Sequence, residues 1–277
     1  MNRRNRIIGS ITPPIILDFL KSNRNSINYF KFKEILNRNR VWDNKFAGEQ
    51  IIILGNGPSL KKVDLKLLEG KKVIVMNSFE KADWKDKVEI IAHCIGEPYG
   101  SRGWSETSFT ESIEGTDSHS YWLHYSSYNK LSKISKPDLV HYVFPSYEPA
   151  IWGNNRFLLN RKTLAYQTTA QLAIQVAFYM GFKEIILLGF DHDWLASPDY
   201  SKHFYSDDRD PMDVLIGFNY FDIISLMHRM WNIYYTIKAS SEKCNIKIYN
   251  LSQGSYLDVF ECLSFSEFDK MNNKLDL

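Results

Sequence analysis

From residue 49 onward, short apolar runs alternate with stretches of helical periodicity. The predicted strands cover residues 51–54, 73–76, 90–92, 184–188 and 246–249, and the predicted helices cover residues 166–180 and 222–242. Strands and helices that alternate in this way are typical of a doubly wound α/β fold with a mostly parallel sheet. We therefore expect one such domain over residues 47–265, followed by a C-terminal tail at 266–277.

Two segments of this domain lack regular periodicity. Residues 96–161 are rich in Ser, Tyr, Trp, Gly and Pro, and residues 195–220 are polar and acidic. Long irregular segments inside a compact domain often act as functional lids. The sequence therefore predicts an irregular insert at 96–161 and a lid at 195–220.

Residues 1–46 form a basic amphipathic arm in this interpretation. A helix can start at Pro14, and a second amphipathic piece covers residues 27–36. The first 50 residues contain 10 Lys or Arg against 4 Asp or Glu, and the arm carries the aromatic residues Phe19, Phe30, Phe32 and Trp42. Two interpretations stand: the arm lies on an anionic membrane surface, or it packs on the main domain or a partner subunit.

The composition is that of a globular protein in a reducing compartment. Of its residues, 44% are hydrophobic and 24% are charged, and the net charge is only +2. Because the excess positive charge is confined to the arm, we expect no nucleic-acid partner. Cys94, Cys244 and Cys262 form no CxxC pair, which argues against a zinc site and a disulfide framework. The chain lacks a long apolar run and the core of a signal peptide, so we expect a cytoplasmic protein.

A glycine-rich turn follows the first predicted strand, with the sequence Gly55-Asn56-Gly57-Pro58-Ser59-Leu60. The two glycines let the backbone approach a ligand closely, and Ser59 can cap the short helix that follows. The Asn56 amide can offer a nucleotide both a donor and an acceptor. An ordinary strand-to-helix turn is the alternative interpretation.

Other polar residues follow the remaining predicted strands. They are Asn77 after the second strand, Asp191 after the fourth, and Ser252 and Ser255 after the last. The carboxyl ends of parallel strands meet at one edge of a sheet, so these groups can converge on one ligand.

Thr168 and Thr169 add hydroxyls beside a helix amino terminus, where free N–H groups favour phosphate. This combination suits a nucleotide. The dinucleotide fingerprint GxGxxG and the Walker GKS or GKT are both absent.

Together, these motifs resemble a known enzyme family. The glycine-rich turn, Asn77-Ser78-Phe79, the Thr168-Thr169 pair and Gly189-Phe190-Asp191 are similar to segments of the family 42 bacterial sialyltransferases. A related group, described as like the 6-hydroxymethylpterin diphosphokinases, shares the same segments. The resemblance covers about residues 49–95 and 163–260.

The resemblance implies a single-domain variant of the nucleotide-sugar glycosyltransferase fold that binds a CMP-activated sugar acid. Asn56, Gly57 and Ser59 would hold the phosphate and ribose. Asn77 would lie on the cytidine side, and Thr168-Thr169 would bind the donor phosphate or the sugar carboxylate. The family inverts the anomeric centre with a histidine base and without an essential metal, so the CMP-sugar is a substrate and no cofactor is expected.

The catalytic base is assigned less directly, because this chain has Asn219-Tyr220-Phe221 where the family has its histidine. His203 in the lid is the first candidate, and His192 is the second. His228, inside the long helix, is expected to be structural. Tyr205 or Tyr200 would replace the family tyrosine that assists the leaving phosphate.

Asp191-His192-Asp193 also forms a DxD motif, which holds Mg²⁺ or Mn²⁺ in many other glycosyltransferases. We favour the interpretation in which Asp191 orients the backbone or the donor hydroxyls and no metal binds. Asp207-Asp208-Arg209-Asp210 is a second acidic cluster.

Three functions follow as hypotheses. The first is transfer of a sialic-type or related keto-sugar acid to a bacterial surface glycan, which could be lipid-linked. The second is a Mg²⁺-dependent diphosphokinase that acts on a pterin or similar alcohol, and the third is a noncatalytic nucleotide-binding protein. With the first hypothesis we associate peripheral contact with the inner face of the inner membrane, and assembly as a homo-oligomer is left open.

Overall fold

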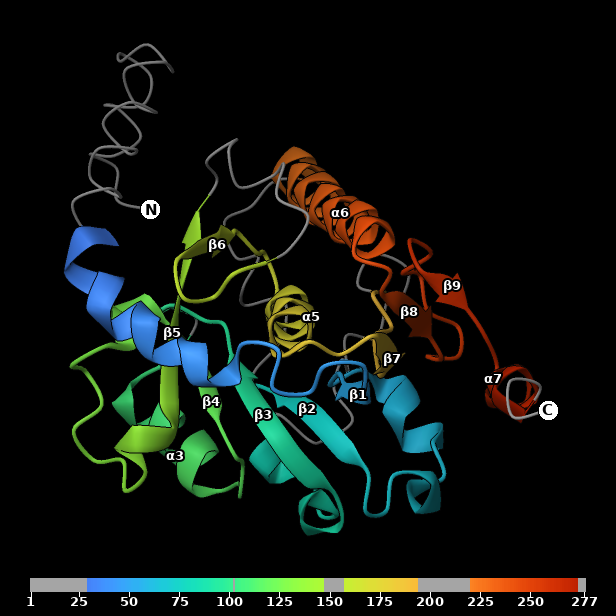
Figure 1. Cartoon of the computed structure of the whole chain (residues 1–277), viewed down its shortest axis with the longest axis horizontal. Helices are drawn as coiled ribbons and strands as arrows, with labels where there is room; N and C mark the ends of the chain where they lie inside the picture. Colours follow the sequence, from blue (N-terminus) through green and yellow to red (C-terminus); the bar gives the residue numbers. More distant parts are fainter. Residues whose placement is uncertain (1–28, 102, 147–156, 194–219, 274–277) are drawn as a thin grey trace.

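Parallel strands form one continuous sheet across the molecule (Figure 1). The computed structural model describes residues 29–101, 103–146, 157–193 and 220–273. In these residues the sheet has nine strands in the order β6-β5-β4-β3-β2-β1-β7-β8-β9, and every neighbouring pair is parallel. The strands are β1 Gln50–Leu54, β2 Lys72–Met76, β3 Glu89–Ile95, β4 Tyr121–His124, β5 Val140–Ser146, β6 Lys162–Leu164, β7 Glu184–Leu188, β8 Lys247–Asn250 and β9 Glu261–Cys262.

Helices cover both faces of this sheet, so its central strands are apolar on both sides. Ile51 and Ile53 of β1 belong to one core cluster, and Ile52 and Leu54 belong to another. Successive side chains of a strand point to opposite faces, and a parallel sheet is normally covered on both. The predicted doubly wound α/β fold is therefore confirmed.

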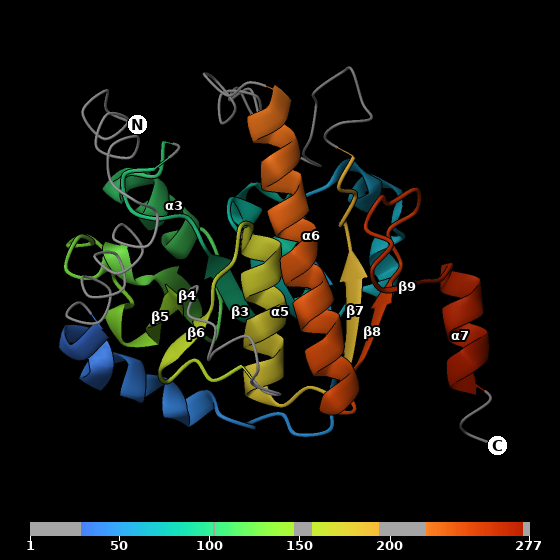
Figure 2. The ribbon, with the colours of Figure 1, turned by 90° about the horizontal axis from the view of Figure 1, so that it is seen from above.

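One face carries the two long helices (Figure 2). These are α5, Thr169–Met180, and α6, Tyr220–Lys243. The other helices are α3, Glu106–Glu114, and α7, Phe265–Asn273, with a helical stretch at 29–37 that continues into the 3₁₀ turn Arg38–Trp42. None of the described helices is long and apolar enough to cross a membrane.

Helix α5 is a central buried element. All 12 of its residues are buried. Thr168 is its N-cap in extended conformation, which explains why the helix predicted from residue 166 begins at residue 169. Gly181 ends it at a φ of +93°, as glycine commonly does at this position.

The prediction of an irregular insert at 96–161 is wrong for much of its described part, which contains α3, β4 and β5. The two strands are rich in aromatic and polar side chains, so they lack the aliphatic runs of β1 and β7. Their side chains are nevertheless buried, with Tyr121 and Trp122 at 0% exposure. As a consequence, Asp191 follows the seventh strand of the chain and not the fourth.

The predicted boundary at residue 46 does not separate an arm from the domain. Leu36 and Asn39 are fully buried, and Trp42 belongs to the main core cluster. Residues 29–46 are therefore part of the packed domain, and residues 1–28 lie outside the described residues. Phe268 of the predicted tail is also buried and packs on Tyr249. Residues 194–219, which include nearly all of the predicted lid, also lie outside the described residues.

Candidate functional site

The strand order reverses between β1 and β7. The chain runs outward from β1 through β6 and then returns through α5 to place β7 on the other side of β1, with Gln50 opposite Glu184. At such a switch point the loops after the two strands diverge to opposite faces, which leaves a crevice at the carboxyl edge of the sheet.

A cavity of about 120 Å³ lies at this edge, and we call it the first cavity. Its walls come from the loops after β1, β2 and β7 and from the amino terminus of α5. The predicted site residues that line it are Asn56, Gly57, Asn77, Thr168, Thr169, Asp191 and His192. The structure therefore brings together most of the side chains proposed from sequence.

Glycines bring the loops after β1 and β7 into direct contact. Gly55 N–H donates to the Leu188 carbonyl at 2.6 Å, and Gly57 N–H donates to the Gly189 carbonyl at 2.9 Å. A Cβ on Gly57 would lie only 1.8 Å from Asp191 Oδ2. Because Gly57 has an ordinary φ of −69°, it is needed for space and not for backbone freedom.

Ser59 and Asp191 join the same two loops. Ser59 does not cap the short helix Pro58–Lys62 as expected, because Gly57 occupies the N-cap position. Instead, the Ser59 hydroxyl donates to Asp191 Oδ2 at 2.9 Å, and its N–H points to the same carboxylate at 3.2 Å. Burial raises the pKa of Asp191, which these hydrogen bonds partly offset. Asp191 thus holds the glycine-rich turn in place.

Asn56 also has a partner within the fold. Its side chain is buried, and its Nδ2 donates to the Met76 carbonyl at the end of β2, at 3.1 Å. Sequence analysis assigned this donor to a nucleotide. In the structure it ties the loop after β1 to the neighbouring strand.

Asn77 presents a hydrogen-bond donor to the first cavity. Its φ is +50°, and its Oδ1 accepts from the Thr169 hydroxyl at 2.9 Å. Thr169 in turn accepts from Gly96 N–H at 3.3 Å, and His93 Nε2 donates to the Asn77 carbonyl at 2.6 Å. Since Oδ1 is committed to Thr169, the Nδ2 group of Asn77 is left for a ligand, and no described residue accepts from it.

His192 is buried in the wall between this cavity and α6. Its Nε2 lies 2.8 Å from the Tyr234 hydroxyl, and its ring is parallel to Phe190. Burial lowers the pKa of His192 to about 4. This environment is that of a structural histidine whose Nε2 already has a protein partner, and it does not favour a role as general base.

Ser252 and Ser255 do not line the first cavity. Phe190 N–H donates to the Ser252 hydroxyl at 2.9 Å, and the Ser255 hydroxyl donates to the Phe190 carbonyl at 2.5 Å. The two serines therefore hold the backbone N–H and carbonyl of one residue, Phe190, in the loop after β7, and they act on the site only through that loop.

Three other candidates lie away from this cavity or cannot be placed. His203 and Tyr205 lie outside the described residues, as does the second acidic cluster. His228 is exposed on α6, with Asn232 Nδ2 at 3.3 Å, and it does not line the first cavity. In the part of the chain that the structure describes, no group of three or more His, Cys, Asp or Glu is arranged to hold a metal ion.

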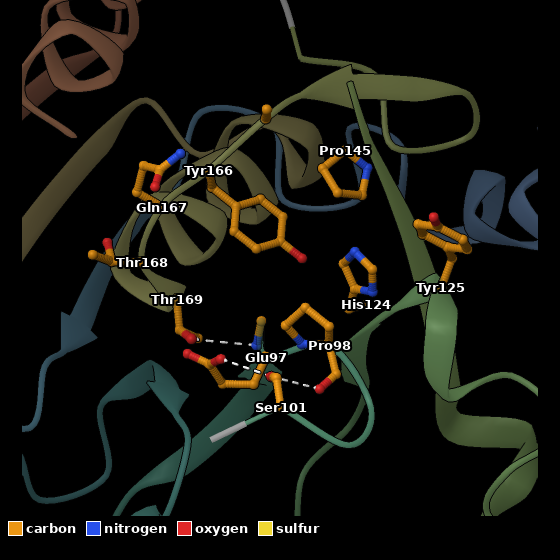
Figure 3. A pocket seen from close by; sticks show the side chains of 12 residues that line it. Glu97, Pro98, Ser101, His124, Tyr125, Pro145, Tyr166, Gln167, Thr168 and Thr169 are labelled. Carbon is orange, nitrogen blue, oxygen red and sulfur yellow. Dashed lines mark hydrogen bonds between the residues drawn. The ribbon is translucent and has the colours of Figure 1, made fainter. Parts of the chain in front are cut away.

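A second, larger cavity of about 400 Å³ adjoins the first (Figure 3). The two share Thr168 and Thr169. The side chains around the second cavity are mixed aromatic and polar: Glu97, Pro98, Ser101, His124, Tyr125, Pro145, Tyr166 and Gln167. Sequence analysis missed this set, because it ended the third strand at Ala92 and did not recognise β4. The apolar run Tyr121-Trp122-Leu123 before His124 was the available signal.

The amino terminus of α5 is the part of the first cavity that favours an anion, because the lining also includes the carboxylates of Asp191 and Asp193. In the first turn of α5, Thr168 caps the N–H of Gln171, whereas the N–H groups of Thr169 and Ala170 lack acceptors within the helix and lie beside the Asn77 amide. Neither Lys nor Arg is found among the described residues that line the two cavities. Dipoles and neutral donors would therefore supply the attraction.

The fold is similar to solved glycosyltransferase structures. The sialyltransferase CstII from Campylobacter jejuni in complex with CMP-3FNeuAc is 16% identical, with 78% of this chain and 86% of that chain covered and a TM-score of 0.46. CstII in complex with a trisaccharide acceptor and CMP is also 16% identical, with 77% and 85% covered and a TM-score of 0.45. The Maf glycosyltransferase from Magnetospirillum magneticum is 12% identical, with 88% and 41% covered and a TM-score of 0.42.

No curated protein matches the chain. A family model, described as 6-hydroxymethylpterin diphosphokinase MptE-like, matches residues 24–197, which is more than half of the sequence. The chain therefore belongs to the MptE-like family, one of the two related groups that its motifs resemble.

Proposed function

We propose that this protein is a glycosyltransferase that moves a sialic-type or related keto-sugar acid from a CMP-activated donor to a glycan acceptor. The observation that carries this proposal is the first cavity, at the switch point of the sheet, with neutral hydrogen-bond donors gathered around a helix amino terminus. The motifs shared with family 42 enzymes give the proposal its donor class.

The adjoining cavities suggest how substrates would be arranged. The nucleotide would occupy the first cavity, with its single phosphate at the amino terminus of α5 near Thr168 and Thr169. The sugar would extend past these threonines into the second cavity. As the bond between sugar and phosphate breaks, the helix N–H groups and the Asn77 amide would stabilise the charge that develops on CMP.

The proposed general base remains His203. Its alternative, His192, is buried against Tyr234, so its ring is poorly placed to remove a proton from an acceptor hydroxyl. The base would take the proton of an acceptor hydroxyl as its oxygen bonds to the anomeric carbon on the face opposite CMP, and departure of CMP would leave that centre inverted.

The family description points to a second candidate, a diphosphokinase of a pterin or similar alcohol. Such an enzyme binds a triphosphate and usually needs Mg²⁺ together with basic side chains. The described lining residues include no Lys or Arg, and the carboxylate of Asp191 is engaged by Ser59. These residues fit a metal–triphosphate complex poorly, and we favour the CMP-sugar.

Calorimetry with CMP and with ATP plus Mg²⁺ tests the assignment directly. We expect CMP to bind in excess EDTA, and transfer from a CMP-sugar to survive EDTA. Binding of Mg²⁺-ATP without binding of CMP would instead favour the diphosphokinase and contradict the CMP-sugar donor.

A pair of matched variants locates the site. Asn77→Asp replaces the cavity donor by a carboxylate and should weaken CMP binding by about 1.5–3 kcal/mol. Asn129→Asp is the control, since Asn129 has a similar φ of +57° but is exposed and lines neither cavity. Equal CMP affinity in the two folded variants would show that Asn77 does not bind CMP.

A further inference from the structure

The proton position on one histidine of the second cavity can be deduced from its neighbours. His124 ends β4 and caps the short helix Tyr125–Ser127. The N–H of Ser126 donates to His124 Nδ1 at 3.2 Å. A backbone N–H can only donate, so Nδ1 must act as an acceptor and carry no proton.

The hydroxyl of Ser126 is compatible with this assignment. Its oxygen accepts from Tyr99 N–H at 2.8 Å and lies 2.8 Å from His124 Nδ1. Because hydrogen-bond donors and acceptors must match, the hydroxyl directs its own proton to the bare Nδ1, and its two lone pairs leave it free to accept from Tyr99 N–H. The imidazole proton is therefore on Nε2. Burial also lowers the pKa of His124 to about 4, which keeps the ring neutral near pH 7.

The Nε2–H group is left for the second cavity. No described residue accepts from it, while the Tyr125 ring, with its centroid 4.5 Å away, fixes the orientation of the imidazole. Figure 3 shows the His124 ring facing Tyr166 across the cavity, with Pro98 and Pro145 beside it. A largely buried donor of this kind is costly unless a ligand or water accepts its proton.

We propose that the second cavity is a sugar subsite in which His124 donates a fixed hydrogen bond to a sugar oxygen. This inference rests on the proposed function, and its ligand is a pyranose that presents a hydroxyl, acyl or carboxylate oxygen. The volume of about 400 Å³ is within the range of about 300–1,000 Å³ that is usual for small-molecule sites. The sugar could belong to the donor or to the acceptor glycan.

The same geometry assigns His124 a binding role and not that of general base. A base must present a lone pair to the hydroxyl that it deprotonates. The lone pair of His124 is at Nδ1, directed away from the cavity toward Ser126. Only a tautomer that breaks the hydrogen bond from Ser126 N–H would reverse this.

Kinetics of three variants test the role. His124→Phe keeps the ring shape and removes the donor, and it should raise the KM of one sugar substrate about tenfold while CMP affinity stays within about twofold. His124→Gln restores an N–H donor and should recover part of the loss. His119→Phe is the control, because His119 is a half-exposed histidine outside both cavities. A raised KM for the CMP-sugar identifies the donor as the ligand, and a raised KM for the glycan identifies the acceptor.

Nitrogen NMR of the wild-type protein measures the His124 ring nitrogens directly. If His124 had only a structural role, added sugar would not shift these signals. We expect a bare Nδ1, a protonated Nε2, and a shift of the Nε2–H signal when methyl β-galactoside or the CMP-sugar is added. A protonated Nδ1, an unmoved signal with all sugars, or a His124→Phe variant that loses turnover at constant KM would overturn the proposal. If the galactoside shifts the signal but CMP does not bind, the subsite stands and the proposed donor is wrong.

Discussion

Gly57 is a residue at which the site leaves no room for a side chain. A Cβ there would meet the Asp191 carboxylate and come within 2.6 Å of the Gly189 carbonyl oxygen. We predict that Gly57→Ala separates the loops after β1 and β7, destabilises the fold by about 1–3 kcal/mol and strongly weakens CMP binding. Urea unfolding and calorimetry measure the two effects.

Gly254→Ala is the matched control for this substitution. Gly254 has a φ of +75° and nothing within 4 Å of a built Cβ, so alanine adds backbone strain without a clash. The expected cost is about 1–2 kcal/mol of stability with CMP affinity retained. If Gly57→Ala behaved like Gly254→Ala in both measurements, close approach of the loops would not be required.

For single residues, the sequence predicted which side chains lie at the site better than it predicted what each of them binds. Asn56, Asn77 and Asp191 could be placed together because strand ends converge. Whether a serine bonds a ligand or the protein depends on distances that no local pattern encodes. For this reason Ser59, Ser252 and Ser255 were expected to bind a ligand and are instead found holding loops.

Among the elements, the amino terminus of α5 has the closest link to function. The Thr169 hydroxyl joins it to Asn77 and to Gly96, at the ends of β2 and β3. Thr169→Val keeps the shape but loses both hydrogen bonds, each contributing about 0.5–1.5 kcal/mol, so CMP affinity should fall about tenfold. Ser105→Ala, which removes the cap of α3, should lower stability without changing CMP affinity. An equal CMP affinity in the two variants would contradict this role.

A substitution of the buried Asn39 tests how much the helical stretch before β1 contributes to the stability of the domain. Asn39 Nδ2 donates to the carbonyls of Tyr142 and Leu159, at 2.8 and 2.7 Å, and its Oδ1 contacts His141. Asn39→Ala leaves these buried groups without their partner and should cost about 2–4 kcal/mol of stability. The exposed Asn37 is the control, and Asn37→Ala should be nearly neutral. Similar thermal midpoints for the two variants would show that this segment adds little to the domain.

Elements with a strong local signature were predictable, and the others were not. Helix α5 has an apolar periodicity, a threonine cap and a terminal glycine, so its existence and end could be read from the sequence. Strands β4 and β5 contain aromatic residues, two histidines and Pro145, and they are strands because neighbouring strands pair with them. That information is not local, so the segment looked irregular.

At the scale of the whole molecule, buried histidines govern the response to acid. Burial lowers the pKa of His93, His124, His141 and His192 to about 4, from an ordinary value of 6.5. The unfolded chain therefore binds these protons first. The stability associated with the neutral rings is complete above pH 6.5 and is lost as the pH falls toward 4, by about 1.4 kcal/mol per pH unit for each ring.

We therefore predict a steep loss of stability between pH 6.5 and pH 4, measured from urea midpoints at several pH values. Glu80 and Asp191 act in the opposite direction, because burial raises the pKa of both carboxyls. Because there are two such carboxyls and four such histidines, the histidines determine that the free energy of unfolding falls as the pH is lowered. A free energy of unfolding that stayed constant from pH 7 to pH 5 would rule out this account.

Membrane association is a separate prediction for the whole chain. Residues 1–28 contain 5 Lys or Arg and 1 Asp, whereas Trp42 farther along the arm is buried in the core. We propose that residues 1–28 bind anionic liposomes and that a variant beginning at residue 29 folds but does not pellet with them. The test should not remove residues 29–46, because that would expose the core. Equal pelleting of the full chain and this variant would refute the proposal.

The pairing of β1 with β7 also has a consequence for synthesis of the chain on the ribosome. The paired residues Gln50 and Glu184 are 134 positions apart. Until β7 emerges, β1 has an unpaired edge next to a glycine-rich turn, a surface that can pair with other chains. The proposed nucleotide ligand would stabilise only the product in which both strands are present. A stalled or truncated polypeptide would therefore be both unable to bind nucleotide and prone to aggregation.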